Sequence, residues 1–178
     1  MLNEQTEIDL YDDVSNPLDG IEEIITNNDW TFNRMSEDEL TVHVSGKQGH
    51  YKMAFIWQED FSAMQFCCAP DLSVSVNKLD EAARIINRIN ADLWLGHFDV
   101  RTQFSKNNTA KTHIPCFRHT SLFRGVTDSS GVEHMEDLID IALSECERYY
   151  MTFELLSRTS LRGSKDIALA MMDIAGRS

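Results

Sequence analysis

The residues of this chain that could do chemistry are mainly four cysteines and six histidines. The cysteines are Cys67, Cys68, Cys116 and Cys146, and no two of them have CxxC spacing. Neighbouring residues of a strand point to opposite faces, so Cys67 and Cys68 are not expected to converge. Cys116 or Cys146 could act as a nucleophile only beside a base, and the sequence identifies none. Buried structural thiols are the simpler interpretation of all four.

The histidines do not form a recognisable metal site. No HxH, HxxxH or HExxH pair occurs, and no carboxylate pair stands at ligand spacing beside a histidine. The sequence also contains no P-loop, GxGxxG turn or GxSxG elbow. We therefore predict no catalytic residue, no metal ligand and no cofactor, and we expect a protein that is not an enzyme.

The charge balance disfavours nucleic acid and membranes as partners. The chain carries 29 acidic and 16 basic residues, a formal net charge of -13, and no basic cluster. Phosphate groups would be repelled by such a surface. The longest wholly apolar run, 167–172, is too short to span a bilayer, and no secretory signal precedes the domain. A cytoplasmic protein is expected.

Hydrophobic periodicity divides the chain into helices and antiparallel strands. Residues 1–15 are expected to form a disordered acidic leader, followed by a single domain at 16–176. Apolar residues at three- and four-residue steps predict helices over 16–28, 77–93 and 165–175, and a long helix that begins at 130 and is broken at 162–164. Alternation predicts strands over 30–34, 40–45, 51–58 and 63–69, and a β-hairpin within 93–125 whose polar loop covers 105–112. The order is helix, four-strand antiparallel meander, helix, β-hairpin and long C-terminal helix, which indicates an α+β fold.

Six short segments are informative when they are taken together and in order. They are Asn16 to Leu18, Asn28 to Arg34, Phe55 to Asp60, Leu93 to Asp99, Phe117 to His119 with Leu122, and Cys146 to Tyr150. Together they resemble the YbjN family, a bacterial group of sensory transduction regulators. The Gly-His-Phe-Asp and Glu-Arg-Tyr-Tyr forms resemble its alphaproteobacterial branch.

The resemblance implies a fold similar to that of type III secretion chaperones, small acidic homodimers that bind extended segments of other proteins. No catalytic residues are attributed to the family, so none is carried over. The chain departs from the family pattern in its long loop at 104–112, at Met151, where a proline is expected, and in the polar stretch 157–162.

The leading hypothesis is a protein-binding module, homodimeric, that acts as a chaperone-like adaptor or sensory transduction regulator. Aromatic residues often anchor interfaces, although core packing is the alternative for most of them here. The residues expected near a dimer or partner surface are Trp57, Trp94, Phe98, Arg118, Tyr149 and Tyr150. A second hypothesis is a small-molecule sensor with a pocket between the sheet and the helices. A third is a hydrolase or redox enzyme that uses Cys116 or Cys146.

Overall fold

The structure is a computed structural model that describes residues 16–104, 111–124, 126 and 128–158. The predicted leader at 1–15 and the predicted helix at 165–175 lie outside the described residues, as does most of the polar loop. The described elements in chain order are α1 (Leu18–Asn27), β1 (Thr31–Ser36), β2 (Glu39–Ser45), β3 (His50–Gln58), η1 (Glu59–Phe61), β4 (Ala63–Pro70), η2 (Val76–Lys78), α2 (Leu79–Asp92), β5 (His97–Phe104), β6 (Lys111–Leu122) and α3 (Asp128–Ser157).

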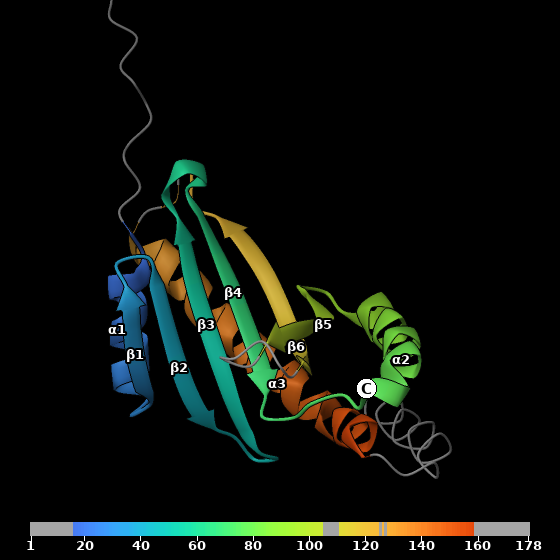
Figure 1. Ribbon diagram of the computed structural model, residues 1–178. Helices are drawn as coiled ribbons and strands as arrows, with labels where there is room; N and C mark the ends of the chain where they lie inside the picture. The colour runs from blue at the N-terminus through green and yellow to red at the C-terminus, as the bar shows by residue number, and fades with distance from the viewer. Residues whose placement is uncertain (1–15, 105–110, 125, 127, 159–178) are drawn as a thin grey trace, which may run out of the picture.

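The strands form one antiparallel sheet in the order β1-β2-β3-β4-β6-β5. β4 therefore pairs with the second strand of the hairpin, and β1 and β5 lie at the two edges. In Figure 1, α3 runs behind the sheet and α2 stands beside β5. This arrangement confirms the predicted α+β fold of helix, meander, helix, hairpin and long helix.

Local hydrogen bonds and backbone geometry define both ends of α1. The Asn16 side chain accepts a hydrogen bond from the Leu18 amide at 3.0 Å, which satisfies one of the free donors of the first turn. At the other end, Asp29 adopts a positive φ of 56°, and the Trp30 amide donates to the Ile25 carbonyl at 3.1 Å. A left-handed residue followed by such a bond is a common helix stop.

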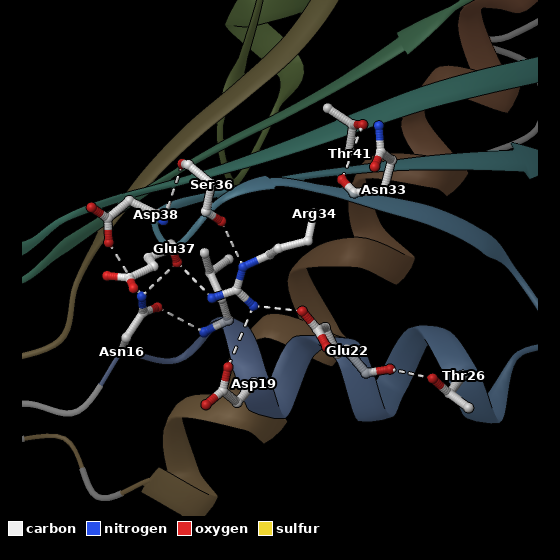
Figure 2. Close-up of polar contacts among 11 residues, drawn as sticks. Asn16, Asp19, Glu22, Thr26, Asn33, Arg34, Ser36, Glu37, Asp38 and Thr41 are labelled. Carbon is white, nitrogen blue, oxygen red and sulfur yellow. Dashed lines mark hydrogen bonds and ion pairs between the residues drawn. The ribbon is translucent and has the colours of Figure 1, made fainter.

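Arg34 of β1 connects α1 to the turn between β1 and β2 (Figure 2). Its guanidinium binds the Glu22 carboxylate at 2.5 Å and lies 3.4 Å from Asp19. It also donates to the backbone carbonyls of Ser36 and Glu37, at 2.8 and 2.5 Å. The Asn16 side chain donates to the same Glu37 carbonyl at 2.9 Å, so two of the six family-like segments meet in one polar network between α1 and the sheet.

The core lies between α3, α1 and one face of the sheet. Alternate residues of the central strands point into it, among them Leu40, Val42, Met53, Phe55, Phe66 and Cys68. The apolar face of α3 covers them from Met135 to Leu156. Because α1 and α3 cover one face of the sheet, the side chains on the opposite face remain available for binding.

No helix of the described segments is long and apolar enough to cross a membrane.

Candidate functional site

The sheet face that turns away from α3 carries a pocket of about 450 Å³. Side chains of β2 to β6 line it, and its floor is made of small residues. Thr41, Ala54 and Cys67 are direct cross-strand partners on β2, β3 and β4, so three short side chains lie in a row. Small residues in the middle of a twisted sheet leave a hollow that larger neighbours surround. The volume is in the range of small-molecule sites.

The lining of the pocket mixes charges of both signs. Lys52 and Arg101 contribute cations, and Glu39 and Asp71 contribute carboxylates. The imidazoles of His43 and His50 lie on the same lining, and the His50 Nδ1 atom is 3.1 Å from the Ser45 hydroxyl. Such a lining suits a polar molecule better than an apolar one.

Two cysteines lie together in this pocket. Cys67 of β4 is paired with Arg118 of β6, and Cys116 lies two residues away on the same face of β6. The thiols of Cys67 and Cys116 are hydrogen-bonded to each other. The Arg101 guanidinium reaches across from β5, and its Nη1 atom is 3.7 Å from the Cys67 sulfur. The sheet register therefore places two thiols and two guanidinium groups at one point.

This environment acts in opposite directions on the two thiols. The hydrogen bond with Cys116, together with the positive charges of Arg101 and Arg118, lowers the pKa of Cys67, although burial opposes the change. The same hydrogen bond, together with burial, raises the pKa of Cys116. Of the two thiols, Cys67 is therefore the one whose anionic form the surroundings favour.

The other two cysteines lie on the core face. Cys68 and Cys146 are fully buried, and the Cys146 thiol donates to the Cys68 carbonyl at 3.6 Å. A separate hydrogen bond with the Cys68 side chain, together with burial, raises the pKa of Cys146. The prediction that Cys67 and Cys68 point to opposite faces is confirmed.

The thiols that the sequence suggested as possible nucleophiles differ from the one whose pKa is lowered in the structure. The sequence suggested Cys116 and Cys146, and the pKa of each is raised. The residue with a lowered pKa is Cys67, which the sequence analysis treated as structural. The alternation of β6 already predicts that Arg118 and Cys116 lie on one face of the strand. The pairing of β6 with β4 is needed to show that Cys67 lies beside them.

The histidines of the described segments make other contacts. The Nε2 atom of His134 is 2.9 Å from the Ser121 hydroxyl, across from α3 to β6. Burial, with His134 and His97 nearby, lowers the pKa of His119. Among the residues that the structure describes, no group of three or more His, Cys, Asp or Glu side chains could hold a metal ion.

The six residues expected near a partner surface do not share one surface. Trp57, Phe98 and Tyr149 are at most 4% exposed and pack in the core, so this expectation is corrected for them: their side chains offer no surface to a partner. Trp94, in contrast, is fully exposed between α2 and β5. Tyr150 is half-buried against the ring of Tyr51, with centroids 6.2 Å apart.

Arg118, the sixth of these residues, lies beside the pocket. It forms an ion pair with Asp99 at 3.2 Å, and both side chains are partly exposed. It also contacts the Cys67 thiol. A partner contact through Arg118 would therefore involve the open face of the sheet and not the face that α3 covers.

Three of the family-like segments meet in one aromatic cluster. The Phe98 ring lies 5.7 Å from Phe117, 5.9 Å from Tyr149 and 5.1 Å from Phe153, measured between centroids. The side chain of Asn90 holds the Phe98 backbone by accepting from its amide at 2.7 Å and donating to its carbonyl at 3.0 Å. These segments hold the hairpin against α2 and α3, so their common role is structural.

Comparison with known proteins agrees with this fold. One solved structure, titled "Crystal structure of YbjN, a putative transcription regulator from E. coli", aligns with a TM-score of 0.54 and 11% sequence identity, over 75% of this chain and 91% of that one. None of the curated proteins compared with the chain matches it. The model of one family, described as "YbjN: Putative bacterial sensory transduction regulator", matches residues 17–155. The chain therefore belongs to the YbjN family.

Proposed function

We propose that this protein is a cytoplasmic regulator without catalytic activity that senses a small polar molecule bound on the open face of the sheet. The observation that carries the proposal is the pocket of about 450 Å³ with its mixed polar lining. The sequence predicts such a pocket between the sheet and the helices. Buried apolar side chains occupy that interface, so the proposal moves the input site to the opposite face.

A residue at the centre of the floor offers a direct test. Ala54 points into the pocket from the central strand β3, and its side chain is only half-buried. Ala54→Trp should fill the pocket without disturbing the core, which lies on the other side of the sheet. We expect the wild type to bind at least one member of a panel of amino acids, nucleotides and carboxylic acids in an NMR titration. The variant should bind that compound at least about tenfold more weakly.

The matched control is Thr120→Trp. Thr120 is exposed on the same face of β6 but does not line the pocket. It should leave the affinity unchanged and show that a tryptophan on this face is tolerated. The proposal is overturned if no compound of the panel binds the wild type, or if both variants bind it as the wild type does.

A second candidate function is that of a homodimeric, chaperone-like adaptor that binds another protein. The observation that favours it is the complete exposure of Trp94. Edge strand β1 also presents apolar side chains to solvent, since Phe32 is 38% and Met35 58% exposed. Large apolar groups at a surface often belong to interfaces. We propose that a second copy of the chain covers Trp94.

Light scattering during size-exclusion chromatography tests this second candidate. A homodimer should elute with twice the chain mass of 20.4 kDa, and Trp94→Ser should shift it toward the monomer. Phe61→Ser is the control, because Phe61 is also an exposed aromatic residue, 61% accessible, at a distant turn. A wild type that stays monomeric at high micromolar concentration would remove the proposal.

A further inference from the structure

We propose that Cys67 and Cys116 form a reactive thiol pair for hydroperoxides, in which Cys67 attacks the peroxide and Cys116 then closes a disulfide. The two residues belong to β4 and β6, the two adjacent strands at the centre of the pocket wall, and both line the pocket. The thiol chemistry does not depend on the proposed function. Only the idea that oxidation at the pocket is a regulatory signal rests on it. The chemistry itself requires nothing but the four side chains described below.

The geometry brings the two sulfur atoms together. Cys67 is the direct partner of Arg118, and Cys116 is the diagonal neighbour of Cys67 on the same face. The two thiols interact with each other, and both line the same pocket. The Cys116 sulfur also lies 3.3 Å from the Phe117 carbonyl, which is the alternative acceptor for its single proton.

The charges around Cys67 favour its anionic form. The guanidinium groups of Arg101 and Arg118 both contact its sulfur from β5 and β6. The Asp99 carboxylate is paired with Arg118 at 3.2 Å and so compensates part of one of these charges. The other charged or titratable residues on the pocket lining are Glu39, His43, His50, Tyr51, Lys52 and Asp71. Two cations in direct contact are a recognised way to hold a thiolate at neutral pH.

The reaction balances with hydrogen peroxide as the oxidant. The Cys67 thiolate attacks one peroxide oxygen, the O–O bond breaks, and the products are a Cys67 sulfenic acid and hydroxide, which takes up a proton to become water. The Cys116 sulfur then attacks the sulfenic sulfur. A disulfide forms, and the hydroxyl group of the sulfenic acid leaves with the Cys116 proton as a second water molecule. Two thiols are oxidised and one peroxide is reduced to two waters.

The same chain contains an internal control for this chemistry. Cys68 and Cys146 form a second thiol contact on the opposite face of the sheet, where both are fully buried. The pKa of Cys146 is shifted by Cys68, by burial, by the Phe117 backbone and by Glu145, and not by an arginine. Burial without cationic partners makes a thiol inert, so this pair should not react while the fold is intact.

The experiment treats the full-length reduced protein with hydrogen peroxide under native conditions and maps the products by mass spectrometry. We expect loss of two hydrogens and a peptide cross-link between Cys67 and Cys116, reversed by a thiol reductant. In Cys116→Ser, dimedone should trap a sulfenic acid on Cys67. In Cys67→Ser, no cross-link should form. Three outcomes would overturn the proposal: oxidation of Cys68 or Cys146 as fast as that of Cys67, no cross-link in the wild type, or no dimedone adduct on Cys67 in Cys116→Ser.

Alkylation by iodoacetamide as a function of pH tests the role of the arginines. For Cys67, whose pKa is lowered to about 6, the rate should reach its plateau by neutral pH, whereas a free cysteine titrates at about 8.5. Arg101→Gln should shift this midpoint upward, and Arg84→Gln on the exposed side of α2 should not. A midpoint that is the same in all three proteins would contradict the assignment. These readouts report on sulfur alone, so they remain decisive even if no small molecule binds the pocket.

Discussion

Phe98→Ala should lower the free energy of unfolding by about 4 kcal/mol, the largest loss that we expect from one side chain of the hairpin. Phe98 is 1% exposed, and its ring contacts three other aromatic rings, those of Phe117, Tyr149 and Phe153. Truncation removes the buried ring and leaves a cavity that the aromatic neighbours on β6 and α3 cannot close. Urea denaturation followed by circular dichroism measures the change, as a shift of the midpoint at constant slope.

The matched control is Phe104→Ala. Phe104 lies at the other end of the same strand and is 56% exposed, so its removal should change the stability by less than about 0.5 kcal/mol. If Phe98→Ala costs less than about 1 kcal/mol, the aromatic cluster repacks freely and does not hold the hairpin in the way that we describe.

Gly96→Ala should be the second most damaging substitution, with a loss of about 3 kcal/mol. Gly96 adopts a φ of +68°, which L-residues with a side chain rarely adopt. A Cβ atom at this position would also lie 2.3 Å from the Phe117 ring and 2.9 Å from the Arg118 carbonyl. The turn between α2 and β5 therefore requires glycine for two independent reasons. Thermal and urea unfolding of the variant measure their sum.

A double variant separates the two causes. Phe117→Leu removes part of the ring that the new methyl group would strike, but it leaves the backbone strain and the contact with the carbonyl. In Gly96→Ala with Phe117→Leu, we expect a total loss smaller than the sum of the two single losses, because the residues are in contact. Strict additivity would show that the ring does not contribute to the cost.

The residues of the family-like segments lie together in the structure. Gly96 and Phe98 belong to one family-like segment, Phe117 to another and Tyr149 to a third, and the structure brings all three together. Asn16 and Arg34 act in the same way at the other end of the sheet, where they connect α1 to the first hairpin. The residues of these segments that are named here are thus determinants of the fold.

The sequence alone determined the secondary structure and its order, because both depend on local patterns. Apolar residues at helical spacing marked α1, α2 and α3, and alternation marked the strands of the meander. Short connections forced those strands to be antiparallel neighbours, so the α+β class followed without any knowledge of long-range contacts. The opposite orientation of Cys67 and Cys68 was likewise a consequence of strand periodicity.

Only the tertiary structure decided which residues form the candidate site. The pairing of β4 with β6 brings Cys67 to Arg118 and Cys116, which are distant from it in the chain, and Arg101 reaches the same place from β5. The same packing buries Trp57, Phe98 and Tyr149, whose aromatic character alone could not distinguish core from surface. A register between distant strands depends on how whole faces fit together, and a one-residue change would reverse every side chain. For that reason, the pocket and its thiol pair could not be deduced from local spacing.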